Sequence, residues 1–179
     1  MIKGSTTVVV TGGAGFIGSH LTHALLREGF RVRVVDDLST GKIRNLEEAA
    51  GCSFPNDGKQ EKDRNPVRLG DRAELIRGDI SDLPTCRAAC EGASFVFHLA
   101  ALGSVQRSVE DPLTSHRINA TGTLNLLQAA REGGVKRLVD SAFDLVTIIF
   151  HPLLPHNSKP FRPVIFFALQ NFCVIQLSP

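Results

Sequence analysis

Five short runs of apolar residues recur along the first 140 positions of the chain, each bounded by polar residues or turn formers. The first is an unbroken β-branched run that leads into glycines, and the fourth is almost continuously apolar. Runs of this length and composition are typical of strands buried within a parallel sheet. The predicted strands are residues 8–10, 31–35, 73–77, 94–99 and 136–139.

A helical pattern follows the glycines after the first strand. Ile17, Leu21, Ala24 and Leu25 recur at helical spacing until Gly29 provides a stop. The sequence therefore predicts a strand, a glycine turn and a helix in direct succession.

Two further helical patterns lie later in the chain. In the first, Cys86 and Cys90 are four residues apart and are predicted to share one face, with Ser81 as the cap. The second pattern starts at Pro112. In it Ala120, Leu124 and Leu127 are predicted to face inward, and Gly133 and Gly134 are predicted to end the helix. Alternation of such helices with the strands predicts an α/β fold, a Rossmann-like doubly wound parallel sheet with right-handed crossovers.

Two stretches interrupt this alternation. Residues 51–70 are rich in Gly, Pro, Asn, Asp, Lys and Arg, which predicts a solvated loop between the second and third strands. From residue 141 on, prolines interrupt the apolar residues and no pattern of helices and strands can be traced. We therefore expect residues 1–140 to form one domain whose sheet is truncated after about the fifth strand, with an unpaired edge, and residues 141–179 to form an irregular, divergent tail.

Composition narrows the class of protein. The chain has 179 residues, 42% of them hydrophobic, and a formal net charge of +2 with basic and acidic residues interspersed, so we expect no nucleic-acid partner. No signal peptide is evident and the apolar stretch 164–177 is shorter than a bilayer span, so no membrane partner is expected. The four cysteines lack CxxC spacing, which favours reduced thiols in the cytoplasm and no metal site.

The segment TGGAGFIGSH, residues 11–20, carries the candidate chemistry. It contains Gly13-x-Gly15-x-x-Gly18 and the overlapping spacing that starts at Gly12, placed between a predicted strand and a predicted helix. Glycines at such a turn permit positive φ, close approach of a pyrophosphate and close helix packing, while the free amides of the helix face the phosphates. The alternative is that these glycines only form a tight turn.

Asp36 ends the second predicted strand, at about the distance from the glycines where a carboxylate meets the adenosine ribose. A carboxylate there repels a 2′-phosphate, so the cofactor is predicted to be NAD rather than NADP. Arg33 and Lys42 lie nearby in the sequence and leave NADP open.

Several consecutive segments resemble the extended short-chain dehydrogenases, in particular the NAD-dependent epimerase/dehydratase family. These are TGGAGFIGSHL, VVDDLSTGK, GDISD, VFHLAALGSVQRSVEDP and NATGTLNLLQAAREGGVKRLV, which together cover about residues 7–139. Within the family, AALGSVQRSVEDPLTS is most similar to UDP-N-acetylglucosamine 4-epimerases, with UDP-glucose and UDP-glucuronate 4-epimerases as close alternatives and dehydratases or reductases as a further one.

The resemblance implies a set of binding residues and a partner. A UDP-sugar is the implied substrate, contacted by Gly103 and Ser104, and a homodimer is the implied assembly. The implied cofactor-binding residues are Gly12, Gly13, Gly15, Phe16, Ile17, Gly18, Asp36, Asp37, Asp79, Ile80, Leu99, Ala100, Ala101 and Asn119. Individually, Asp79 has the alternative role of a helix cap, and His98 is predicted to be a packed strand residue rather than a base.

The catalytic part of the family pattern is absent. In the family a Tyr removes the proton from the sugar 4-hydroxyl, and a Lys four residues later lowers the pKa of that Tyr. This chain contains no Tyr, so no YxxxK pair exists, no catalytic residue is predicted, and Ser141 is only an uncertain counterpart of the family's serine-rich strand end. From residue 143 on no family segment is found, which suggests a shifted reading frame, an alternative splice or a decayed gene.

Two functions follow from this pattern. The chain is either the NAD-binding portion of a UDP-hexose 4-epimerase-like protein that is inactive in isolation, or a non-enzymatic NAD-binding remnant.

Overall fold

The computed structural model describes residues 6–51, 66–141 and 173–177. One sheet runs through all three segments, in the order β3-β4-β2-β1-β5-β6-β7. The five central strands are parallel, and β3 and β7 pair antiparallel at the two edges. The strands are β1 Thr7–Thr11, β2 Arg31–Asp36, β3 Val67–Leu69, β4 Ala73–Arg77, β5 Phe95–His98, β6 Arg137–Asp140 and β7 Cys173–Gln176.

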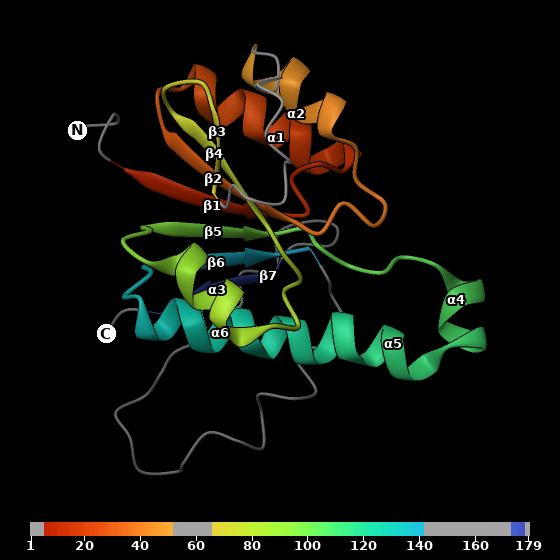
Figure 1. Ribbon diagram of the computed structural model, residues 1–179. Coiled ribbons are helices and arrows are strands. Elements are labelled where there is room, and N and C mark those ends of the chain that lie inside the picture. The colour runs from red at the N-terminus through yellow and green to blue at the C-terminus, as the bar shows by residue number, and fades with distance from the viewer. Residues whose placement is uncertain (1–5, 52–65, 142–172, 178–179) are drawn as a thin grey trace, which may run out of the picture.

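Helices cover both faces of the sheet, with α1 and α2 on one side and α3 and α6 on the other (Figure 1). This arrangement confirms the α/β, doubly wound class that the alternation predicts. None of the helices in the described ranges has the length and apolarity needed to cross a membrane. The helices are α1 Phe16–Arg27, α2 Ile43–Ala50, α3 Leu83–Cys90, α4 Val105–Glu110, α5 Pro112–His116, the π-helical turn η3 Arg117–Thr121, and α6 Gly122–Glu132.

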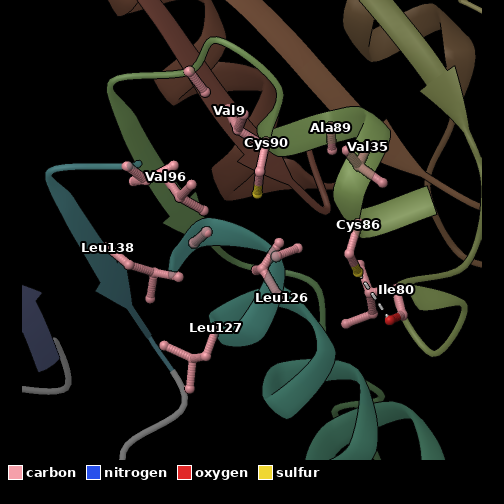
Figure 2. Packing of buried hydrophobic residues seen from close by; sticks show 14 of the residues in the cluster. Val9, Val35, Ile80, Cys86, Ala89, Cys90, Val96, Leu126, Leu127 and Leu138 are labelled. Carbon is pink, nitrogen blue, oxygen red and sulfur yellow. Dashed lines mark hydrogen bonds between the residues drawn. The ribbon is translucent and has the colours of Figure 1, made fainter. Parts of the chain in front are cut away.

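The larger of two hydrophobic cores lies between the sheet and the pair α3 and α6. Val9, Val96 and Leu138 occupy one cross-strand row of β1, β5 and β6, and all three are buried. Leu126 of α6 packs against this row together with Cys86 and Cys90, and Figure 2 shows the close approach of these side chains. The two cysteines share the buried face of α3, as their spacing predicts.

The ends of the sheet differ from the expectation. β3 lies inside the stretch 51–70, which the sequence predicts to be a loop, and its buried Val67 and Leu69 flank a single exposed residue. β7 pairs with the outer edge of β6, so the edge predicted to be unpaired is hydrogen-bonded. The sequence did not predict β3 because turn-forming residues dominate the stretch around it. It did not predict β7 because the prolines upstream interrupt the apolar pattern. The rest of the predicted tail, residues 142–172 and 178–179, lies outside the described residues.

Several details of the helices also differ. Asp82, not Ser81, caps α3, because its carboxylate accepts the amide of Thr85. Helix α1 turns Gly18, Ser19 and Thr22 toward the sheet and leaves Ile17 and Ala24 exposed. Leu21 and Leu25 of the predicted pattern are partly buried and pack against the smaller core. Apolar periodicity therefore identifies part of the buried face of α1 and misses the small residues that contact the sheet. Ala120 in η3 and Leu127 in α6 are buried as predicted, whereas Leu124 of α6 is 41% exposed.

His98, the last residue of β5, is a buried strand residue as predicted. Its Nδ1 lies 2.7 Å from the Thr11 hydroxyl and its Nε2 lies 2.9 Å from the Thr123 hydroxyl. The Thr123 hydroxyl donates its own proton to the carbonyl of Asn119, so Nε2 must donate to Thr123. Nδ1 is therefore the acceptor from Thr11, and the ring is the neutral Nε2–H tautomer. Burial lowers the pKa of His98 to about 4.

We expect Leu126→Ala to lower the free energy of unfolding by about 2–5 kcal/mol, because it leaves a cavity in the larger core. Urea denaturation followed by circular dichroism measures this loss. Leu124→Ala is the matched control on the same helix, and it should change stability by only about 0.5 kcal/mol. Equal losses for the two variants would contradict the assigned buried face of α6.

His98 should also make stability depend on pH. The folded-state pKa of about 4 lies below the ordinary value of 6.5, so the unfolded chain binds a proton that the folded chain excludes. The free energy of unfolding should fall by about 3 kcal/mol as pH drops from 6.5 to 4, and this term is absent above pH 6.5.

Denaturation at several pH values in His98→Asn should show a shallower fall than in the parent chain. His20 is exposed, so His20→Asn is the matched control and should keep the parent profile. Parallel profiles for the parent and His98→Asn would contradict the neutral, buried ring.

Candidate cofactor-binding site

A cleft of about 320 Å³ opens at the carboxyl ends of the parallel strands, where the chain crosses from one face of the sheet to the other. This is the position where open α/β sheets bind ligands. Its walls come from the glycine turn after β1, the segments after β2 and β4, and the segment after β5. The lining residues are Gly12, Gly15, Phe16, Ile17, Gly18, Val35, Asp36, Asp37, Ser39, Thr40, Gly41, Gly78, Asp79, Ile80, Leu99, Ala100, Ala101, Leu102, Ile118 and Ser141.

The glycine turn brings backbone into contact with backbone. Gly12 has a φ of +67°, and a Cβ there would lie 2.8 Å from the amide nitrogen of Ala100. A Cβ on Gly18 would collide with the carbonyl oxygen of Gly12, so α1 can start this close to β1 only with glycine. Gly15 is the N-cap of α1 and has no side chain to cap it, which leaves the first-turn amides without a side-chain acceptor. Such an end suits a phosphate.

Asp36 ends β2 directly beside the glycine turn. Its carboxylate accepts the backbone amides of Ala14 and Leu38, each at 2.9 Å. Burial raises the pKa of Asp36, and the two amide hydrogen bonds oppose that rise. The side chain lines the cleft and retains acceptor capacity for ligand hydroxyls.

The two cations that left NADP open do not line the cleft. Arg33 bonds to Glu74 at 2.5 Å and donates to the carbonyls of Ala89 and Glu91. These carbonyls lie at the end of α3, on the face of the sheet that α3 and α6 cover. Lys42 is exposed at the start of α2. Neither contributes to the lining, whereas Asp36 and Asp37 both do.

Asp79 follows β4 and lines the cleft beyond Asp36. Its Oδ1 accepts the Ser81 amide at 2.8 Å and its Oδ2 accepts an Arg117 guanidinium N–H at 2.8 Å. Burial alone would raise the pKa of Asp79, but the hydrogen bonds from Ser81 and Arg117 outweigh it and lower the pKa. The alternative role of Asp79 as the cap of α3 is excluded because Asp82 fills that position.

The segment after β5 forms the opposite wall. The Thr11 hydroxyl accepts the amides of Leu99 and Ala100, each at 3.2 Å, while it donates to His98. Two residues beyond Ala100, Asn119 holds Leu102, since its Oδ1 accepts the Leu102 amide at 2.8 Å. The wall is therefore fixed by side chains behind it.

Most residues that the resemblance implies for the cofactor line this cleft. Gly13 does not, because it is buried against Val34, and Asn119 lies behind the wall rather than in it. Gly103 and Ser104 lie outside the lining, and Ser104 caps α4 by accepting the Arg107 amide at 3.3 Å.

Other lining residues were not predicted. The segment after β2 adds Ser39, Thr40 and Gly41, and its position after Asp36 in VVDDLSTGK is the only sequence signal for it. Val35, Gly78, Leu102 and Ile118 also lack a chemical signature. Ser141 reaches the cleft, and its hydroxyl donates to the His98 carbonyl at 3.3 Å.

Comparison with known proteins agrees with this geometry. The model of the NAD dependent epimerase/dehydratase family matches residues 8–142. The UDP-glucose 4-epimerase of Mycolicibacterium smegmatis is 37% identical over 135 residues, which cover 75% of this chain and 37% of that protein.

Two solved structures share the fold. The UDP-glucose 4-epimerase of Thermus thermophilus, in complex with NAD, is 36% identical with a TM-score of 0.57, over 74% of this chain and 36% of that one. The UDP-N-acetylglucosamine 4-epimerase of Methanobrevibacter ruminantium, in complex with UDP-N-acetylmuramic acid, is 34% identical with a TM-score of 0.57, over 75% and 36%.

The chain thus spans little more than a third of the length of these relatives. The matched region nevertheless runs from the glycine turn through β6 and includes both walls of the cleft. By this match, the chain belongs to the NAD-dependent epimerase/dehydratase family.

Proposed function

We propose that this chain is the NAD-binding portion of a UDP-sugar 4-epimerase-like protein and does not epimerise sugars by itself. The observation that carries the proposal is the Asp36 carboxylate, which is bonded to Ala14 inside the glycine turn and lines the same cleft. A turn that accepts a diphosphate and an adjacent carboxylate that accepts ribose hydroxyls together fit a dinucleotide.

The residues present fit NAD better than NADP. The first-turn amides of α1 would hold the diphosphate, and Asp36 would accept hydrogen bonds from the ribose. A 2′-phosphate would meet this carboxylate with no cation in the cleft lining to offset it. When bound, NAD supplies the group that accepts a hydride from the sugar carbon and returns it. The related Thermus thermophilus structure holds NAD.

The proposed substrate class is a UDP-sugar. The relatives in the comparison are UDP-sugar 4-epimerases, with UDP-glucose and UDP-N-acetylglucosamine in their names. In this chain Gly103 and Ser104 follow the cleft wall at Leu102, and Ser104 starts α4. We propose that this segment faces the sugar. We also propose that the protein is a homodimer and that it is located in the cytoplasm.

The missing base limits the chemistry. Removal of a proton from a sugar hydroxyl at neutral pH needs a group whose pKa lies near 7. The chain has no Tyr, and His98 is committed to two threonine hydroxyls inside the fold. Ser141 lines the cleft, but its hydroxyl donates its proton to the backbone carbonyl of His98, which is not a general base. The second candidate is a non-enzymatic NAD-binding remnant. It is favoured because the chain retains the cofactor cleft although its sequence contains no Tyr.

Isothermal titration calorimetry with the 179-residue chain should detect NAD binding. Asp36→Ala should weaken it at least about tenfold, because a hydrogen bond to a charged acceptor is lost. Gly15→Val should abolish it by placing a branched side chain in the phosphate site. Asp71 is exposed in the turn between β3 and β4, outside the cleft, so Asp71→Ala is the charge-matched control and should bind like the parent. No NAD binding by the parent chain would refute the proposed cofactor site.

Incubation of the chain with NAD and UDP-glucose, UDP-glucuronate or UDP-N-acetylglucosamine should yield neither the 4-epimer nor a dehydrated 4-keto sugar. Chromatography of the nucleotide sugars measures this, with an intact UDP-glucose 4-epimerase as the positive control. Turnover that disappears in Asp36→Ala would contradict the proposed inactivity and show that another group supplies the acid–base step.

A further inference from the structure

The π-helical turn η3 contacts both walls of the cleft. Arg117, its first residue, donates through Nη1 to the carboxylate of Asp79 and to the hydroxyl of Ser81. Two residues later, Asn119 accepts the Leu102 amide at 2.8 Å on the opposite wall, and Ile118 between them lines the cleft. Single π-helical turns are rare and frequently occur at functional sites.

Sheet order decides which end of a dinucleotide lies beside Arg117. The strands run β4, β2, β1, β5, so Asp79 after β4 lies beyond Asp36 after β2 and beyond the glycine turn after β1. A dinucleotide with its diphosphate at the glycine turn and its ribose at Asp36 therefore directs its base toward Asp79. This step rests on the proposed NAD site.

Asp79 is held as a pure acceptor. Its two oxygens accept three protein donors, the amide and the hydroxyl of Ser81 and an N–H of Arg117, which leaves the carboxylate a lone pair for a ligand donor. The same two partners lower the pKa of the carboxyl against the effect of burial, so it is ionised at neutral pH. An ionised carboxylate attracts a base edge that carries an amino group and repels one that carries a carbonyl oxygen.

From this arrangement we infer that Arg117 is a positioning residue that orients Asp79 to accept the amino group of the adenine base, so that η3 contributes to selection of the base. Arg117 is half-exposed and does not line the cleft itself. It acts through Asp79, with Ser81 as its second anchor.

The test compares NAD with nicotinamide hypoxanthine dinucleotide, which has a carbonyl in place of the adenine amino group. Calorimetry on the full chain should show about tenfold tighter binding of NAD. Arg117→Ala should reduce this ratio of dissociation constants to within about twofold of unity. Arg117→Lys, which keeps the charge, and Ser81→Ala, which removes the second anchor, should give intermediate ratios. These two milder variants decide the matter if Arg117→Ala does not fold.

Two controls separate base selection from a general loss of structure. Asn119→Ala breaks the other contact of the same turn and should weaken both dinucleotides equally, with the ratio unchanged. Arg131→Ala removes an exposed arginine of α6 that bonds to Gln128, and should leave both affinities unchanged.

The outcomes distinguish this inference from the proposed function. If the parent chain binds NAD but Arg117→Ala keeps the full preference over the hypoxanthine dinucleotide, or if the parent shows no preference, the role of Arg117 is refuted and the NAD site stands. If the parent chain binds neither dinucleotide, both are refuted.

Discussion

The cofactor cleft depends on backbone meeting backbone at the glycine turn, with no side chain between the two. Gly12 lies against the amide of Ala100, and Gly18 lies against the carbonyl of Gly12. These contacts fix the spacing of β1, α1 and the segment after β5 at once. A methyl group at either glycine would force the three apart, and the first-turn amides of α1 and the carboxylate of Asp36 would no longer face one space.

A polar network behind the cleft complements this close packing. The Thr11 hydroxyl accepts the amides of Leu99 and Ala100 because its proton is directed to His98. The neutral ring of His98 in turn donates its Nε2 proton to the hydroxyl of Thr123 in α6. The wall of the cleft is thus linked to a helix on the far side of the sheet through groups that are all hydrogen-bonded, which keeps their burial tolerable.

Sequence reasoning was most accurate where one physical signal dominated. Short runs typical of strands located all five parallel strands, and the spacing from the glycines to Asp36 placed the glycine turn and this carboxylate in the same cleft. It was inaccurate where tertiary contacts override local pattern. The three-residue strand β3 exists because β4 lies beside it, and α1 buries small residues that carry no hydrophobic signal. Arg117 gave no sequence signal either, since its role depends on a π-helical turn that places it beside Asp79.

The antiparallel strand β7 has a consequence for how the sheet can grow. A strand offers two hydrogen-bonding edges, and β6 uses one for β5 and the other for β7. A sixth parallel strand cannot join β6 while β7 is in place. A parallel strand can therefore extend the sheet at this edge only if β7 is first displaced, so the two arrangements are mutually exclusive states of one edge.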